Sequence, residues 1–538
     1  MIVDARTLPD KELIETDVCI VGAGVAGITL AREFIDGRFK VILLESGGFE
    51  PDRATQSLYW GENIGHPYYP LDTARGRFFG GTSHYWHVRL GNGRLGVRLR
   101  SLDGIDFENR EWVPYSGWPF GKATLDPYYE RAHALLEIGP FTYDVRYWQK
   151  RDSNPQLPLA NDRVQTTVFH FASRDLFYGK FREEVTTGKN IDTYLYANVV
   201  EIETDETARK VERLRIATLQ GKTIWITAKR FVLAMGGIEV PRLLLLSNNV
   251  QQNGLGNQDD LVGRFFMEHP HLWSGFYVPS GSHIFDSAGL YQVHSVSDVA
   301  VMGKLTLAED VLRREKLLNY CVSIHPRIVP DPKYLGTPSK GFETLKEMRS
   351  AVRRGKVPED LGKHFVNLVK DFDGVATNLY RKVRRTLHRT RVFHLNHMAE
   401  QAPNPESRIT LGNERDALGQ RRVRLDWQLS AIDMRSMIRA QEIIDEELRR
   451  AGLGRLYIEM HGEKPPAGLH GGWHHMGTTR MHADPKKGVV DANCKVHGIS
   501  NLYIAGASVF PTVGYANPVL TTVALTLRLA DHMKRLMQ

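Results

Sequence analysis

The sequence has few cysteines and no long hydrophobic run, and both absences restrict what kind of protein it can be. Its 538 residues include three cysteines, too few for a disulfide scaffold and none in a C-x-x-C motif. Cys19 lies within an apolar run, where we expect a buried, inert thiol. The longest apolar runs, such as residues 243–246, are far shorter than a membrane span. We expect no membrane segment and predict a cytoplasmic location.

The composition also lacks an excess of either charge. Hydrophobic residues make up 42% and charged residues 25%, which excludes a disordered or collagen-like chain. A net charge of +8 over 538 residues does not indicate a nucleic-acid partner. The start, Met1 to Leu13, carries acidic residues and lacks the apolar core of a signal peptide. The length predicts two domains, or one large domain with insertions.

A strand, a helix and a second strand are predicted near the start of the chain. Thr16–Val21 and Lys40–Leu44 are continuous apolar runs, as in a parallel sheet covered on both faces. Val25–Phe34 lies between them and has a helical pattern. Phe231–Ala234 and Leu502–Ala505 have the same apolar character. We place all four strands in one sheet, so that the domain is discontinuous in sequence.

The turn after the first strand is a G-x-G-x-x-G motif. Gly22 permits the tight turn, Gly24 lets a pyrophosphate approach the backbone, and Gly27 lets the helix pack closely on the strand. Glu45 ends the second strand and can accept hydrogen bonds from a ribose. This combination predicts dinucleotide binding but does not by itself separate NAD from FAD. The alternative is a glycine-rich turn of another α/β fold.

Two further regions are rich in glycine. Arg75 to Trp86 contains Gly80-Gly81-Thr82-Ser83, in which glycines permit close approach to a flat ring and hydroxyls can bond its polar edge. Near the end, Gly471 to Met481 contains two adjacent histidines, and Gly514-Tyr515-Ala516-Asn517-Pro518 follows. An ordinary loop remains the alternative for the first region.

With these motifs in this order, the chain resembles the glucose–methanol–choline (GMC) oxidoreductase family. The resemblance rests on the N-terminal fingerprint, the Gly-Gly-Thr-Ser loop, residues 234–247 and the two C-terminal motifs. It implies an α/β fold with a Rossmann-like FAD-binding domain and an α+β substrate domain whose sheet is mainly antiparallel. We expect residues 1–270 and 470–538 to form the first domain and 271–469 the second, with a basic helical insertion around 345–391.

The middle of the chain supports an antiparallel sheet. Arg422–Leu429 alternates between apolar and polar residues, and a helix that Asp433 can cap follows it to about Gly452. We interpret the basic insertion as a solvated helix face, with contact to a subunit or an anionic partner as the alternative.

The resemblance assigns His474 as the catalytic base and Asn517 as its partner. A neutral imidazole can accept the hydroxyl proton of an alcohol. His475 is the alternative base, and a metal site formed by the histidines at positions 470, 474, 475 and 482 is disfavoured because no carboxylate or cysteine lies at a recognised spacing. Asn517 can instead cap the helix that begins near Pro518.

The resemblance also assigns the cofactor contacts. The expected FAD-binding residues are Gly22, Gly24, Gly27, Glu45, Arg75, Gly80, Gly81, Thr82, Ser83, Val200, Gly506, Ala507 and Pro518. Some pyranose oxidases attach the flavin to a histidine of the Gly-Gly loop; Tyr85 occupies that position here, with His84 beside it. The resemblance therefore favours noncovalent FAD, although a shift of one residue in the alignment would reverse this.

The resulting hypothesis is FAD-dependent oxidation of a ring hydroxyl, at C2 or C3, of a pyranose sugar or glycoside. Residues 400–405 resemble a segment of the pyranose-oxidase-like branch and favour a sugar. The alternatives are oxidation of a non-sugar alcohol, or a flavin electron carrier or redox-sensing protein without an alcohol substrate. Oxygen, a quinone or a redox partner remain open as electron acceptor, and the oligomeric state is open.

Overall fold

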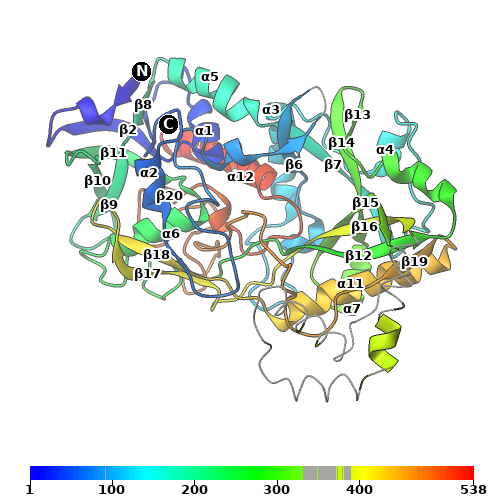
Figure 1. Cartoon of the computed structure of the whole chain (residues 1–538). Coiled ribbons are helices and arrows are strands. Elements are labelled where there is room, and N and C mark those ends of the chain that lie inside the picture. The colour runs from blue at the N-terminus through cyan, green and yellow to red at the C-terminus, as the bar shows by residue number, and fades with distance from the viewer. Residues whose placement is uncertain are drawn as a thin grey trace.

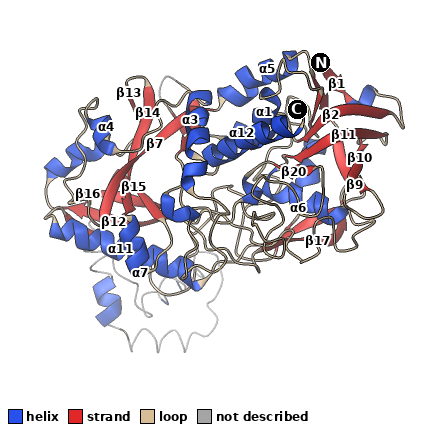
Figure 2. Ribbon diagram, turned by 180° about the vertical axis from the view of Figure 1, so that it is seen from behind, coloured by secondary structure: helices blue, strands red, loops and turns tan. Residues whose placement is uncertain are grey.

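The computed structural model describes residues 1–90, 93–330 and 389–538, with residues 344, 348, 371, 373–378 and 380. Two large sheets lie at opposite ends of the molecule, and long helices cover them (Figures 1 and 2). The main helices are α1 (Val25–Arg32), α3 (Asp126–Leu135), α5 (Phe181–Thr187), α6 (Gly236–Leu246), α11 (Ala431–Arg450) and α12 (Val519–Leu536), with the shorter α2 (Arg53–Gln56), α4 (Val145–Gln149) and α7 (Glu309–Glu315). No helix among the described residues is long and apolar enough to span a bilayer.

The first sheet contains the four strands predicted from the sequence. Its order is β1-β8-β3-β2-β11-β10-β9, and β20 pairs with β11. The pairs of β2 with β3 and of β11 with β2 and β20 are parallel. The bounds are β1 (Ile2–Asp4), β2 (Leu13–Val21), β3 (Val41–Leu44), β8 (Ile191–Leu195), β9 (Asn198–Thr204), β10 (Val211–Ala217), β11 (Thr223–Leu233) and β20 (Leu502–Ile504). The C-terminal helix α12 packs on α1 and α3.

The second sheet is antiparallel and carries the other wall of the site described below. Its order is β19-β12-β16-β15-β14-β7-β6-β5, and β13 pairs with β14. The bounds are β5 (Val88–Arg89), β6 (Leu95–Leu99), β7 (Val164–Ser173), β12 (His271–Pro279), β13 (His294–Val296), β14 (Val299–Leu307), β15 (Tyr320–Pro330), β16 (Arg389–Ala399) and β19 (Gly454–Tyr457). Its apolar face packs on α11, whose stripe includes Met434, Met437, Ile444 and Leu448.

A small third sheet joins β4 (Glu62–Asn63), β17 (Arg408–Arg415) and β18 (Arg421–Asp426). The predicted alternating strand is β18, with Val423 and Leu425 buried. One detail of the prediction was wrong: Ser430 caps α11, and Asp433 stands at its third position and closes a capping box. In this capping box the Asp433 carboxylate accepts the backbone N–H of Ser430, and the Ser430 side chain accepts that of Asp433. Both residue types favour the start of a helix, so the sequence pattern alone did not identify which of them is the N-cap.

Two other expectations concern thiols and charge. Cys19 is buried, as predicted, and burial raises the pKa of its thiol. Cys321 and Cys494 are buried too. The predicted basic insertion at 345–391 lies almost wholly outside the described residues.

Candidate active site

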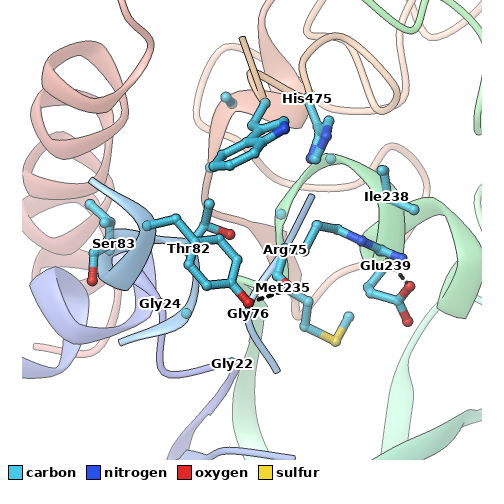
Figure 3. A pocket seen from close by; sticks show the side chains of 18 of the residues that line it. Gly22, Gly24, Arg75, Gly76, Thr82, Ser83, Met235, Ile238, Glu239 and His475 are labelled. Carbon is cyan, nitrogen blue, oxygen red and sulfur yellow. Dashed lines mark hydrogen bonds and ion pairs between the residues drawn. The ribbon is translucent and has the colours of Figure 1, made fainter. Parts of the chain in front are cut away.

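A cavity of about 630 Å³ lies between the two large sheets. Gly22 and Gly24, in the turn after β2 of the first sheet, line one side of it, and His271 and Asn396 of the second sheet line another. The C-terminal segments around His474 and Asn517 also line it. Figure 3 shows that side chains from several separated segments converge on it. A cavity of this size accommodates a sizeable organic ligand.

The N-terminus of α1 opens onto the cavity through glycines. Gly22 has a φ of 102°, a conformation that favours glycine. A Cβ on Gly27 would lie 1.8 Å from the carbonyl oxygen of Gly22, whereas a Cβ on Gly24 would meet no protein atom within 4 Å. Gly27 therefore allows α1 to pack closely against the turn at Gly22. Gly24 leaves free space in front of the N-terminus of α1, where the helix dipole attracts anions.

Glu45 is held at the end of β3 by backbone donors. Its carboxylate accepts hydrogen bonds from the N–H of Ala23 at 3.0 Å and of Gly47 at 2.9 Å. The residue is buried and lines the cavity. The carboxylate is therefore fixed beside the glycine turn, where the sequence predicted it.

A buried ion cluster supports the adjacent wall. Glu239 of α6 pairs with Arg75 at 2.7 Å, Arg77 at 3.4 Å and Arg242 at 3.2 Å. Burial opposes ionisation of Glu239, but the three guanidinium groups lower its pKa to about 2. Arg242 also pairs with Asp416 at 2.6 Å. Figure 3 shows the Arg75–Glu239 pair. Arg75, predicted as a cofactor contact, thus also has a structural role.

Most predicted cofactor residues line the cavity. They are Gly22, Gly24, Glu45, Arg75, Gly81, Thr82, Ser83, Val200, Gly506, Ala507 and Pro518. Gly27 and Gly80 are not among the lining residues. Gly80 has a φ of 91° and makes the turn before Gly81. It therefore sets the backbone conformation of the loop and does not line the cavity itself.

His474 and Asn517 lie together in the cavity wall, although 43 residues separate them in sequence. The Asn517 Nδ2 lies 3.0 Å from the His474 Nε2. The Asn517 Oδ1 is buried and has no hydrogen-bond partner. Pro518 is the N-cap residue of α12, so this amide stands at the N-terminus of that helix. A buried carbonyl oxygen without a partner is a binding group for a ligand donor.

His269 fixes the tautomer of His474. The two Nδ1 atoms lie 2.8 Å apart, and the His269 Nε2 lies 3.3 Å from the Val513 carbonyl. A carbonyl only accepts, so His269 Nε2 carries a proton and its Nδ1 accepts from the His474 Nδ1–H. The lone pair of His474 is therefore on Nε2, the atom beside Asn517.

Both imidazoles are held neutral. Burial lowers the pKa of His269 to about 4. Burial, followed by the proximity of the His269 imidazole and the positive charge of Arg98, lowers the pKa of His474 well below 6.5. A neutral His474 with its lone pair on Nε2 is a base that is ready to accept a proton near pH 7.

Glu268 organises the loop that carries His474. Its buried carboxylate accepts hydrogen bonds from the N–H of Gly472 at 2.9 Å, of His474 at 3.0 Å and of His269 at 3.1 Å, and from the Tyr68 hydroxyl. Burial raises the pKa of Glu268 to about 7, although these donors act against the shift.

His475 has a different environment. Its Nε2 lies 2.9 Å from the Tyr68 hydroxyl, and burial lowers its pKa to about 3. The residue also lines the cavity. Among the described residues, no group of three or more histidines, cysteines or acids is arranged to hold a metal ion.

Several residues of this site were not predicted from the sequence. They are Tyr68, Arg98, Glu268, His269, His271 and Trp473. The run Glu268-His269-Pro270-His271 was an available signal, since adjacent ionisable residues in an apolar context are unusual in a core. The His271 Nε2 and the Trp473 Nε1 are buried without a hydrogen-bond partner and belong to residues that line the cavity.

Comparison with known proteins finds a matching family model and similar sequences. Residues 403–526 match the family model described as GMC oxidoreductase. Over 97% of this chain and 98% of the relative, the sequence is 24% identical to the fructose dehydrogenase large subunit of Gluconobacter japonicus. A segment covering 23% of each chain is 32% identical to a C-glycoside 3-oxidase of Arthrobacter globiformis.

A solved structure shows the same fold. The pyridoxine 4-oxidase described from Mesorbium loti superposes with a TM-score of 0.54 at 17% identity, covering 97% of this chain and 99% of that one. The predicted fold class and the predicted family resemblance are therefore confirmed.

Proposed function

We propose that this chain, whose residues 403–526 match the family model of the GMC oxidoreductases, is an FAD-dependent enzyme that oxidises a secondary ring hydroxyl, at C2 or C3, of a pyranose sugar or glycoside to a keto-sugar. One observation carries the proposal: the lone pair of His474 and the amide of Asn517 meet in the same cavity as the glycine-rich N-terminus of α1. A base and a dinucleotide cradle in one cavity suit alcohol oxidation.

The residues present fit FAD. The space before Gly24 and the N-terminus of α1 suit the pyrophosphate, and Glu45 suits the ribose. Gly506, at a φ of 140°, has no protein atom within 4 Å of a Cβ position and lines the cavity near Pro518. When bound, FAD supplies the hydride acceptor.

We assign His474 as the base. Its Nε2 accepts the hydroxyl proton of the substrate, and the Nδ1–H bond to His269 keeps that nitrogen available. Asn517 holds the substrate oxygen beside this nitrogen through its amide, in a reactive pose. The N-terminus of α12 stabilises negative charge at this end of the cavity.

We propose that the flavin is bound noncovalently. In the Gly-Gly loop Tyr85 lines the cavity, whereas the His84 Nε2 bonds the Phe79 carbonyl at 2.8 Å and His84 is not a lining residue. His87 is exposed at the cavity edge and is the remaining histidine to test. Acid precipitation of the holoenzyme should release the yellow cofactor into the supernatant; colour retained in the pellet would contradict noncovalent binding.

A sugar substrate is supported by the likeness to a fructose dehydrogenase and a C-glycoside 3-oxidase. Residues 1–270 and 470–538 are proposed as the FAD domain and 271–469 as the substrate domain, with β5, β6 and β7 of the first range pairing into the antiparallel second sheet. Oxygen, a quinone or a redox partner takes the electrons, in the cytoplasm.

The test is anaerobic titration of the purified holoenzyme with free sugars, glycosides and simple alcohols, followed by flavin absorbance and by NMR of the product. We expect pyranoses or pyranosides to bleach the flavin and to yield a C2 or C3 ketone. Bleaching by non-sugar alcohols alone would overturn the substrate class. No bleaching by any alcohol would favour an electron carrier or redox sensor.

A further inference from the structure

The substrate-side wall of the cavity is one face of the second sheet. Directly paired residues of antiparallel strands point to the same face, as do residues two apart on one strand. Arg98 pairs with Phe171 and Lys304 with Thr167. Ser323 and Trp273 both pair with Asn396. The register therefore places these polar and cationic side chains on a single face, while the opposite face packs on α11.

Arg98 differs from the other arginines of the cavity. Of the described residues that line it, Arg75, Arg77 and Arg242 are each paired with Glu239. Arg98 lines the cavity too, but it forms no ion pair or side-chain hydrogen bond within the part of the chain that the structure describes. It is half-buried. A guanidinium group that faces a cavity without an acid can bind a carboxylate in bidentate fashion.

A second basic residue lies in the same face. Lys304 is fully buried; its Nζ is 3.8 Å from the Cys321 Sγ and 4.6 Å from the centroid of the Phe169 ring. Neither neighbour is a carboxylate. The face thus holds two basic residues, and no described acid is paired with either. Burial lowers the pKa of Lys304 to about 7, so the positive charge of this face near neutral pH rests mainly on Arg98, and the face favours an anion there.

The carboxylates near this wall are already engaged. Glu400 pairs with Arg110, with both side chains fully buried. Glu459 accepts a hydrogen bond from the Gly275 N–H at 2.9 Å. Neither is within ion-pair distance of Arg98, which leaves that charge to a ligand.

An aromatic surface borders the same wall. The Trp273 side chain is 41% exposed and lines the cavity. The rings of His325 and His394 lie 5.0 and 5.1 Å from its ring centroid. An exposed indole in a cavity wall provides a flat apolar surface for a sugar ring.

We propose that Arg98 binds a carboxylate of the substrate, so that the preferred substrates are acidic pyranoses: uronic acids or glycosides that carry a carboxylate on the ring. The proposal rests on the proposed oxidation of a sugar and names its substrate class. Arg98 supplies the anion contact and Trp273 supports the ring. Lys304 lies on the same face and adds positive charge only in its protonated form.

The experiment compares two substrates that differ only in the carboxylate: methyl glucopyranoside and methyl glucuronopyranoside. Anaerobic stopped-flow reduction of the holoenzyme gives the apparent Kd and limiting rate for each, in the wild type and in Arg98→Gln. Arg98→Lys is the matched control, because it keeps the charge but loses the planar fork. A second readout is the change in flavin absorbance when benzoate binds, which needs no turnover.

We expect the wild type to bind the uronoside more tightly, and Arg98→Gln to weaken that binding about 10- to 100-fold and the binding of the neutral glycoside far less. The affinity of Arg98→Lys for the uronoside should lie between those of the wild type and Arg98→Gln. Benzoate binding should weaken in the same order. Equal use of both substrates by wild type and variant would overturn the inference. So would an equal loss for both substrates in Arg98→Gln, because Arg98 would then act on the cofactor.

Failure of the two proposals is distinguishable. If no sugar reduces the flavin but Arg98→Gln abolishes benzoate binding, the anion site is supported and the proposed sugar oxidation is refuted. If benzoate binds equally to the wild type and to Arg98→Gln, the anion site is refuted, whether or not sugars reduce the flavin.

Discussion

The Nε2 of His474 lies 3.0 Å from the amide nitrogen of Asn517, and its Nδ1 lies 2.8 Å from the Nδ1 of His269. One imidazole is therefore held at both nitrogens. The His269 contact sets where the proton is, and the Asn517 contact marks the nitrogen that faces the cavity. A base whose tautomer and orientation are both fixed before substrate binds loses little free energy to reorganisation in the reaction.

Replacing His474 with alanine should slow flavin reduction by the proposed substrate about 10²- to 10⁴-fold, because the proton acceptor is lost. The variant should keep its FAD, since the cradle around Gly24 is separate. His475→Gln is the matched control, and it should be affected far less because His475 bonds Tyr68. Stopped-flow absorbance measures both. A fast His474→Ala, or a slower His475→Gln, would refute the assignment.

His269→Phe should lower the limiting rate of flavin reduction on the order of 10²-fold while leaving substrate affinity nearly unchanged, because the His474 tautomer is released. His269→Asn, which retains an acceptor, should recover part of the rate. A merely structural role would instead change affinity, FAD content and melting temperature together, and would show no rescue by asparagine.

The pH dependence of flavin reduction should report a base that is already neutral. Burial and nearby positive charge lower the pKa of His474 well below 6.5. The active form is the unprotonated one, so activity is lost only when pH falls through that lowered pKa. We expect a rate that stays constant as pH falls through 6.5, measured with a neutral substrate. An acid limb centred at 6.5 or above would contradict this account.

Glu268 should make the folded protein less stable as pH rises. Burial raises its folded pKa to about 7 from 4.5, so unfolding releases a proton between these values. Its contribution is complete below 4.5 and is lost as pH rises to about 7. Glu268→Gln should remove this part of the slope, measured as the difference in melting temperature between variant and wild type across that range. Parallel curves would show that Glu268 does not titrate there.

Two glycines of the same turn should respond oppositely to alanine. Gly27→Ala places a Cβ 1.8 Å from the Gly22 carbonyl and should destabilise the fold by about 1–3 kcal/mol or more. Gly24→Ala meets no protein atom within 4 Å, so the apoprotein should keep its stability while FAD binds more weakly. Urea unfolding of the apoprotein and FAD titration separate the two. Equal FAD affinity in Gly24→Ala and wild type would exclude the phosphate site there.

Much of the first sheet was predictable because its signals are local. The predicted strands Thr16–Val21 and Lys40–Leu44 end in continuous apolar runs, as buried parallel strands require, and they appear as β2 and β3. The glycine spacing after β2 was equally informative, since the close approach of Gly27 to Gly22 is a property of one turn. The histidine and asparagine of the C-terminal motifs were found by resemblance, and the structure brings them together.

What tertiary structure alone decided is the set of partners around these residues. His269 is 205 residues from His474 in sequence and Glu268 is 206, and no local pattern connects groups so far apart. Arg98 reads in sequence as an ordinary strand arginine, and its importance arises because the fold places it on a cavity face without an acid. Strand character and turn geometry depend on neighbouring residues, whereas proton positions and unpaired charges depend on which remote side chains share a buried volume.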